Sequence, residues 1–239
     1  MFDGDNLFIS NFMKINDLKP LIESIMQSVM LETHYIDETS YPAGFDIKKF
    51  KSIPSFAGRI KYAKQYLQGL GSGTARIALA IDPNTVIKIA KNPKGVAQNK
   101  TEIDVGNVGY KGTAEVKDHD PEGLWVEMER AQKFSTAKFK QATGFGFHEF
   151  GIALNYWYRM NKQSIRGYAP PQAPNQDAIE ETELFTNITT LVGDFDMPIG
   201  DLVRPSSWGI VNRGGREVPV LIDFGVTTDV YKTFYMNKE

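Results

Sequence analysis

The spacing of apolar residues along the chain predicts helices first and a β-hairpin next. Apolar side chains recur at helical spacing between residues 17 and 32, and a second helix is expected at 55–67. Two short β-rich runs follow at 76–81 and 85–90, separated by a turn in which Pro83 presets φ. This order predicts an antiparallel hairpin after an N-terminal helical segment.

The remaining pattern adds a few strands and then mainly helices. A polar helix is expected at 97–105, and two further strands at 112–117 and 124–128. Later segments comprise helices at 147–160 and 180–191, a proline-containing loop at 166–176, and a hairpin formed by 210–211 and 218–222. Helices, a small β-rich part and then helices again predict an α+β fold with two lobes and a cleft between them.

Composition limits the classes of function. The 239 residues carry a formal net charge of -2, with 41% hydrophobic and 23% charged residues, which is ordinary for a globular protein. Without a basic excess no nucleic-acid partner is expected, and without an apolar run of about 20 residues no membrane partner is expected. The absence of cysteine excludes disulfides and a cysteine nucleophile, and with no secretory signal pattern it favours a cytoplasmic protein.

A glycine-rich segment precedes the first hairpin. Gly71, Ser72 and Gly73 are followed by Thr, Ala and Arg76. Glycines in such a pattern mostly serve turns, and the phosphate-loop motif that ends in Gly-Lys-Ser/Thr is absent. A glycine turn leading into a hairpin that carries a lysine is nevertheless the arrangement that kinases lay over the phosphates of ATP.

The lysine of this hairpin is Lys88, which is flanked by apolar strand residues. One interpretation is a lysine on the solvent face of an alternating strand. The other is a lysine inside the cleft, where its ammonium group needs a partner because burying an unpaired charge is costly. Glu102 on the following helix is the candidate partner. A strand lysine paired with a helix glutamate is positioned to reach the α- and β-phosphates of a nucleotide.

The most informative segment lies near the end of the sequence. An apolar run from 218 to 222 leads directly into Asp223, Phe224 and Gly225. An aspartate at the end of a buried strand can place its carboxylate in a cleft to bind Mg²⁺, and the glycine allows the backbone to bend sharply afterwards.

These segments together resemble the protein-kinase-like superfamily over residues 70–225. Gly71-Ser-Gly73, Lys88, Glu102 and Asp223-Phe-Gly225 look like its glycine-rich loop, ATP lysine, helix glutamate and metal-binding motif. The segment 124–129, with Glu127 and Met128, is similar to the strand that enters the hinge, where backbone groups meet adenine. The style of the sequence also resembles kinase-like proteins of tailed phages. The resemblance implies ATP and Mg²⁺ as cofactors.

The catalytic loop departs from the family pattern. Asp201 fits the catalytic aspartate that accepts or orients the attacking hydroxyl, but Ile199 and Gly200 stand where the family has His-Arg or His-Gly. The metal-binding Asn is replaced by Ser206, or by Ser207 in a shifted alignment. A neutral hydroxyl is a poorer Mg²⁺ ligand than an amide carbonyl, so the resemblance implies a weakened second metal site.

Two more departures from the family pattern occur in the glycine-rich loop and after Gly225. Arg76 replaces the third glycine of the loop, and the favoured interpretation places it on the hairpin surface rather than against a phosphate. Only fourteen residues follow Gly225, so an activation segment and a large peptide-binding lobe are not expected. The resemblance therefore implies a two-lobed kinase-like fold with a small β-rich N-lobe and a reduced helical C-lobe.

The sequence leads to one main hypothesis and two alternatives. The expected organisation is an N-terminal helical extension over 1–67, an N-lobe over 68–129 and a reduced C-lobe over 130–239. The main hypothesis is an atypical kinase in which Lys88 and Asp201 are catalytic and Asp223 and Ser206 hold the metal. One alternative is an inactive pseudokinase that serves as an interaction or virion structural module, with a protein partner or as a homo-oligomer. The other is nucleotidylyl transfer by the same residues.

Overall fold

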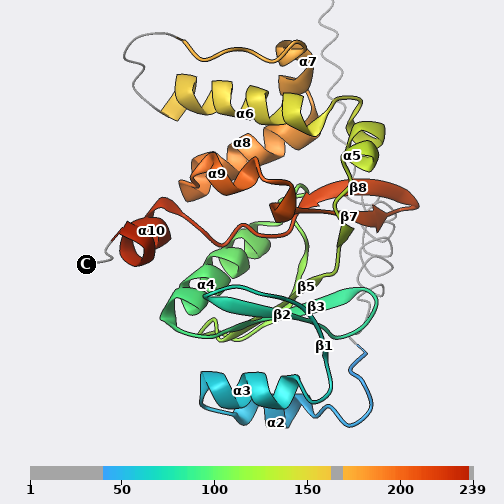
Figure 1. The fold of residues 1–239 in the computed structure, drawn as a ribbon, viewed down its shortest axis with the longest axis vertical. Coiled ribbons are helices and arrows are strands. Elements are labelled where there is room, and N and C mark those ends of the chain that lie inside the picture. The colour runs from blue at the N-terminus through green and yellow to red at the C-terminus, as the bar shows by residue number, and fades with distance from the viewer. Residues whose placement is uncertain (1–39, 163–168, 237–239) are drawn as a thin grey trace, which may run out of the picture. The chain divides into compact units, whose positions relative to one another are not determined.

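The computed structural model describes residues 40–162 and 169–236, and these described residues form one compact unit (Figure 1). The helix expected at 17–32 lies outside the described residues. Within the described part, a β-rich region is followed by a mainly helical region, which confirms the α+β class expected from the sequence.

A five-stranded antiparallel sheet forms the β-rich region, with the strand order β1-β2-β3-β5-β4. Its strands are β1 (Gln68–Ser72), β2 (Arg76–Ala80), β3 (Thr85–Ala90), β4 (Val116–His119) and β5 (Trp125–Glu129). The expected hairpin is the β2–β3 pair, in which Ala78 lies opposite Lys88. The central strand β3 is buried on both faces, so its two sets of side chains enter different cores.

Two short helices cover one face of the sheet. They are α2 (Ile47–Ser52) and α3 (Phe56–Ala63), capped by the side chains of Asp46 and Ser55. A hydrophobic cluster joins them to the sheet and includes Phe50, Tyr62, Leu79, Ile87 and Trp125. Phe50 and Tyr62, which belong to the helical extension expected over 1–67, therefore share a hydrophobic core with the sheet.

The helix α4 (Pro93–Val108) packs on the opposite face of the sheet (Figure 1). It begins four residues before the expected 97–105 segment because Asn92 caps it by accepting from the Gly95 N–H at 3.1 Å, and Pro93 occupies the first turn. Gly95 is needed for close packing, since a Cβ there would lie 2.2 Å from the carbonyl oxygen of Ala75. This contact fixes the start of α4 against the entrance of β2.

The helical region is built on a second core with a small second sheet. Its elements are β6 (Gln132–Lys133), α5 (Thr136–Thr143), α6 (Phe147–Lys162), α7 (Gln176–Glu180), α8 (Glu183–Phe195), α9 (Ile199–Leu202), η1 (Pro205–Ser207), β7 (Trp208–Arg213), β8 (Arg216–Leu221), α10 (Thr228–Tyr231) and a final π-helical turn η2 (Lys232–Met236). The sheet has the order β6-β7-β8. Phe139, Phe150, Trp208 and Phe224 are the largest fully buried side chains of this core.

One expected strand is displaced. The sequence predicts a strand at 112–117, but β4 begins at Val116, and the preceding residues pair with the end of β8 instead. The Ala114 N–H donates to the Leu221 carbonyl at 2.9 Å, and the Leu221 N–H donates to the Gly112 carbonyl at 2.9 Å. These backbone bonds join the first sheet to the segment that carries Asp223.

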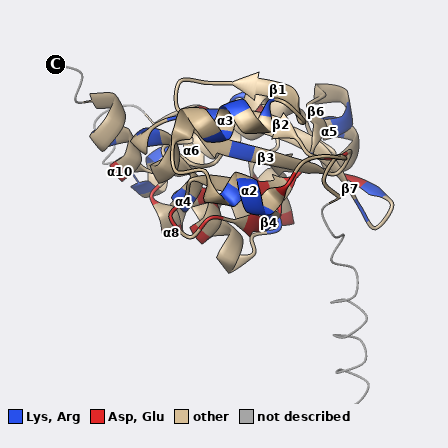
Figure 2. Ribbon diagram, turned by 90° about the horizontal axis from the view of Figure 1, so that it is seen from below, with Lys and Arg blue, Asp and Glu red and all other residues tan. Residues whose placement is uncertain are grey.

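On the side drawn in Figure 2, α2 and α3 carry basic residues, and β4 carries both a basic and an acidic residue. Opposite charges also pair across elements, as Lys51 does with Asp118 at 3.1 Å. No helix within residues 40–162 and 169–236 is long and apolar enough to cross a membrane.

Candidate nucleotide site

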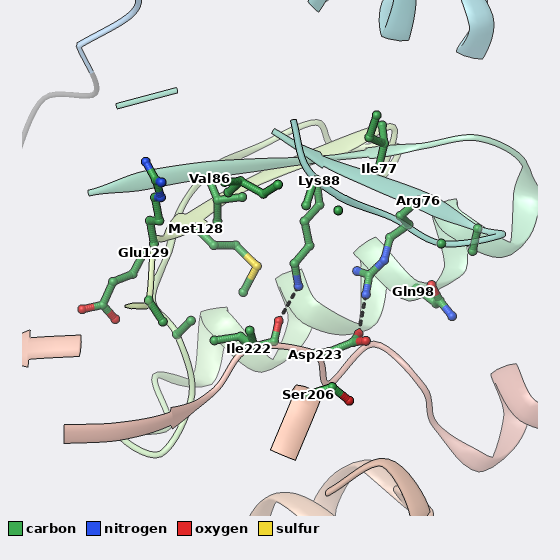
Figure 3. Close-up of a pocket in the computed structure, with 18 of the residues that line it drawn as sticks. Arg76, Ile77, Val86, Lys88, Gln98, Met128, Glu129, Ser206, Ile222 and Asp223 are labelled. Carbon is green, nitrogen blue, oxygen red and sulfur yellow. Dashed lines mark hydrogen bonds and ion pairs between the residues drawn. The ribbon is translucent and has the colours of Figure 1, made fainter. Parts of the chain in front are cut away.

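A cavity of about 860 Å³ lies between the first sheet and the segments around η1 and the end of β8. The apolar end is lined by Val86, Met128 and Ile222, with Glu129 beyond them, and the other end carries Arg76, Lys88 and Asp223 (Figure 3). Ala78 also lines the cavity. The cavity therefore combines a slot for a flat apolar group with a charged end, as nucleotide sites do.

Lys88 points into this cavity and not to solvent. Its side chain is 11% exposed, and its Nζ atom lies 2.8 Å from Oε1 of Glu102, which is fully buried. The ammonium group also donates to the Ile222 carbonyl at 2.6 Å (Figure 3). The expected Lys88–Glu102 pair is confirmed as a contact, and the solvent-face interpretation of Lys88 is wrong because β3 is covered on both faces.

Arg76 is not on the hairpin surface, which corrects the sequence-based expectation. Its side chain is 10% exposed and lies between two carboxylates: Nη1 is 2.7 Å from Oε2 of Glu102, and Nη2 is 2.7 Å from Oδ1 of Asp223. Figure 3 shows the guanidinium directed from β2 toward Asp223. As the first residue of β2, Arg76 projects from the sheet face that α4 covers, and there a charged side chain is stable only with partners.

The buried face of α4 supplies the polar groups around these charges. Gly95, Gln98, Asn99 and Glu102 recur at i, i+3, i+4 and i+7 and are all buried. Asn99 accepts from Arg76 Nη1 at 3.2 Å and donates to the Gly123 carbonyl at 2.9 Å. Sequence reasoning singled out only Glu102; the helical spacing of these polar residues is the signal that would have identified the others.

The four charges perturb one another. Burial lowers the pKa of Lys88, the charge of Glu102 opposes this, and Arg76 lowers the pKa further, so the net shift is downward. Burial also lowers the pKa of Arg76, but Glu102 and Asp223 outweigh it and raise the pKa. Burial raises the pKa of Asp223, yet the charges of Arg76 and Lys88 outweigh burial and hold it below its ordinary value. The two cations and two carboxylates form a neutral cluster.

The glycine turn borders the charged end of the cavity. Gly71 and Gly73 line it, whereas Ser72 does not, because its hydroxyl accepts from Lys91 Nζ at 2.6 Å. Lys91 also donates to the Gly73 carbonyl at 2.5 Å. An added Cβ would meet nothing within 4 Å at Gly71, so neighbouring packing does not require glycine there. The absence of a side chain leaves the backbone open to the cavity.

The apolar end is bordered by the segment that connects the two sheets. Met128 lines the cavity as expected, together with Glu129, Arg130, Ala131 and Gln132. Glu127 is not among the lining residues: it is fully buried, and its carboxylate accepts from the Tyr41 hydroxyl at 2.6 Å. The expectation for Glu127 is thus corrected toward the next residues of the chain, because strand alternation turns its side chain away from the cavity.

Asp223 and Ser206 both lie at the charged end (Figure 3). They are held together by the Ser207 carbonyl, which accepts from the N–H groups of Ile222 at 2.7 Å and Asp223 at 3.3 Å. Gly225 packs on α4, where a Cβ would lie 2.6 Å from the Gln98 carbonyl oxygen. The glycine of this motif is therefore required by close approach to the helix.

Asp223 and Ser206 are the residues expected to hold Mg²⁺. Asp223 is 57% exposed, but its Oδ1 already accepts a charged hydrogen bond from Arg76. Ser206 offers a neutral hydroxyl, whereas Mg²⁺ is usually held through carboxylates and phosphates. Arg76 also places a positive charge where the ion's own charge would lie. In this arrangement the residues do not fit a magnesium site.

Asp201 is placed outside the cavity lining. It lies on α9, and its Oδ1 is paired with Arg204 Nη1 at 2.8 Å, one helical turn away. The structure therefore does not bring the expected catalytic aspartate together with Lys88 and Asp223 as cavity-lining groups. The i,i+3 spacing of Asp201 and Arg204 permits this ion pair.

Tyr235 is a cavity-lining residue that the sequence did not indicate. It lies in η2, accepts from Gln98 Nε2 at 2.9 Å, and has Lys94 Nζ 4.3 Å from its ring centroid. Burial raises the pKa of its hydroxyl; the bond from Gln98 lowers it, and the charges of Asp201 and Asp223 raise it further. The net shift is upward, so the phenol stays protonated near neutral pH.

Comparisons with known proteins are limited. No protein-family model and no curated protein matches the sequence. The structure of the streptomycin–ATP ternary complex of APH(2″)-IIa is similar with 16% identity and a TM-score of 0.30, covering 71% of this chain and 70% of that chain. ADP-bound aminoglycoside phosphotransferase APH(2″)-Ib has 14% identity and a TM-score of 0.30, covering 71% and 69%. At such TM-scores the structural similarity supports no conclusion about the function of this protein.

Proposed function

We propose that this protein binds ATP in the cavity described above and is an atypical kinase-like protein, with an N-lobe over 68–129 and a reduced C-lobe over 130–239. The observation that carries the proposal is the buried Lys88–Glu102 ion pair at 2.8 Å, placed at the charged end of a cavity that is apolar at its other end. An ammonium held in this way is directed at the phosphates of a nucleotide.

The apolar end suits a purine base. Val86 approaches from the sheet, and Ile222 approaches from the segment after β8 (Figure 3). Ala78 of β2 also lines the cavity. Arg130 and Ala131 line the cavity and belong to neither β5 nor β6. Because the Arg130 N–H already donates to the Asn84 carbonyl at 2.8 Å, the Arg130 carbonyl and the backbone of Ala131 would meet the polar edge of the base. A flat apolar slot with a few backbone hydrogen-bonding groups at its rim matches what nucleotide bases require.

The charged end suits the phosphates. Gly71 and Gly73 line this end beside Lys88 and Arg76, whose charges are balanced by Glu102 and Asp223. The Gly73 N–H already donates to the Arg76 carbonyl at 3.0 Å, so the two cations, rather than this N–H, would contact phosphate oxygens. The protein is expected to bind ATP and ADP through the same cavity.

Phosphate transfer would use Asp201 to orient an acceptor hydroxyl. One observation favours a second candidate, a nucleotide-binding protein without transfer activity that acts as an interaction module: Asp201 is paired with Arg204 and lies outside the cavity lining. If transfer occurs, Asp201→Asn abolishes ATP consumption while ATP affinity is retained. If the protein is an inactive module, neither wild type nor the variant consumes ATP.

The decisive experiment is a calorimetric titration of the full chain with ATP and ADP. Lys88→Ala is expected to weaken binding by about tenfold or more, because a charge-assisted contact contributes roughly 1.5–3 kcal/mol. Lys111→Ala is the matched control, since Lys111 is 79% exposed and pairs only at the surface with Glu183. Equal affinities of wild type and Lys88→Ala would contradict the proposed site.

A further inference from the structure

The unusual residue of the site is Arg76, which stands where the resemblance expects a third glycine. It bridges Glu102 and Asp223 at 2.7 Å each, and Asp223 is the residue expected to hold the metal. We propose that Arg76 takes the place of the divalent cation, so that this cavity binds nucleoside di- and triphosphates without Mg²⁺. The inference rests on the proposed nucleotide function and concerns the counterion of the same site.

Charge balance supports the assignment. The cluster holds two cations, Arg76 and Lys88, against two carboxylates, Glu102 and Asp223. A divalent cation bound to Asp223 would stand next to a guanidinium in a partly buried setting, where like charges repel strongly. Oδ1 of Asp223 becomes available to such an ion only when the Arg76–Asp223 pair is broken.

The guanidinium is suited to the role that the metal would have. It is always charged, is less strongly hydrated than an ammonium, and offers five N–H donors in a planar fork that matches phosphate oxygens. Arg76 lines the charged end of the cavity beside Gly73 and Lys88. A phosphate there therefore meets a cation that the chain itself provides.

Arg76 is also held in position before any ligand binds. The fully buried Asn99 accepts from its Nη1 at 3.2 Å and is itself fixed by donating to the Gly123 carbonyl at 2.9 Å. With Glu102 and Asp223 this gives the guanidinium three side-chain partners from α4 and the segment after β8. A cation fixed in this way needs little reorganisation when a phosphate arrives.

The test is a calorimetric titration of the full chain with ATP, once in excess EDTA and once in millimolar Mg²⁺. Wild type is expected to bind with affinities that agree within about threefold in the two conditions, because Arg76 supplies the charge in both. Arg76→Gln is expected to bind about tenfold more weakly in EDTA, as one charge-assisted contact is lost. Mg²⁺ should then restore much of its affinity, because Asp223 is released to bind the metal.

Two further variants keep the test decisive. Arg76→Gln/Asp223→Asn removes both charges of the pair and is expected to bind weakly with no response to Mg²⁺. Arg216→Gln removes an exposed arginine at the start of β8 that does not line the cavity, and should behave as wild type. Thermal unfolding of each variant identifies any loss of fold.

The outcomes separate the two proposals. Strict dependence of wild-type binding on Mg²⁺, or an Arg76→Gln variant with unchanged metal response, overturns the role of Arg76 and leaves the nucleotide site standing. Absence of ATP and ADP binding in both conditions overturns the nucleotide site, and the inference fails with it.

Discussion

Nη2 of Arg76 lies 2.7 Å from Oδ1 of Asp223, 147 residues further along the chain. This contact joins the first residue of β2 to the segment that follows β8, across the cavity between the two sheets. Arg76, which the sequence analysis placed on the hairpin surface, is thereby in contact with Asp223, the residue expected to bind the metal. The charge balance of the cluster depends on this pair as well as on Lys88 and Glu102.

Glu102→Gln is expected to destabilise the fold. The fully buried carboxylate balances both Lys88 and Arg76, and an amide leaves two buried cations with too little negative charge. Removing one partner of a buried ion pair costs about 3–5 kcal/mol. Urea unfolding followed by circular dichroism measures this change in the free energy of unfolding.

The control for Glu102 is Glu122→Gln on the surface. Glu122 is 79% exposed and lies 3.7 Å from Lys100, and exposed pairs contribute roughly 0–1 kcal/mol. Equal effects of the two substitutions would show that Glu102 does not balance the buried cations.

Gly225→Ala tests the close approach between the Asp223 segment and α4. The added Cβ would lie 2.6 Å from the Gln98 carbonyl oxygen, which is backbone and cannot rotate away. Overpacking of this kind costs about 1–3 kcal/mol. Gly193→Ala in α8 meets nothing within 4 Å and is expected to stabilise by about 0.5–1 kcal/mol. Thermal melts of both variants decide the matter, and a Gly225→Ala protein as stable as wild type would refute the contact.

The stability of the fold should depend on Asp223 in a defined pH range. The folded-state pKa of Asp223 lies below its ordinary value of about 3.9. A depressed pKa means that the ionised group contributes stability above the unfolded-state value, and that this contribution is lost as pH falls through the folded-state value. Wild type should therefore exceed Asp223→Asn in stability near neutral pH, and the difference should shrink as the pH falls below the unfolded-state value and through the folded-state pKa. A difference that does not shrink on acidification would count against ionisation of Asp223 as its source.

Ala78→Phe tests the apolar slot independently of the charged end. Ala78 is a small residue of β2 that lines the cavity, and a phenyl ring there would fill the space assigned to the base. ATP affinity is expected to fall by about tenfold or more with little change in the melting temperature. Ala142→Phe, at an exposed position of α5, is the matched control. If ATP binds Ala78→Phe as tightly as wild type, the base lies elsewhere.

Several elements could be predicted because their causes are local. The β2–β3 hairpin follows from two β-rich runs around Pro83. A helix was expected at 180–191, and α8 spans Glu183–Phe195 because Thr182 caps it by accepting from the Phe185 N–H. The start of α4 was expected too late, although Asn92 and Pro93 carry a visible capping signal. The strand expected at 112–117 was displaced because Leu221, more than 100 residues away, supplies the backbone partners of residues 112 and 114.

Some residues of the candidate site could likewise be predicted from local sequence, and others could not. Sequence order and residue type were sufficient to select Lys88, Glu102 and Asp223, since a strand lysine, a helix glutamate and an aspartate after a buried strand each have a local signature. The position of Arg76 had no such signature: whether it faces solvent or carboxylates depends on which face of β2 is covered. Only the packing of α4 and of the Asp223 segment against that face decides it. A guanidinium buried there must find carboxylates, and the tertiary structure brings two of them within 2.7 Å.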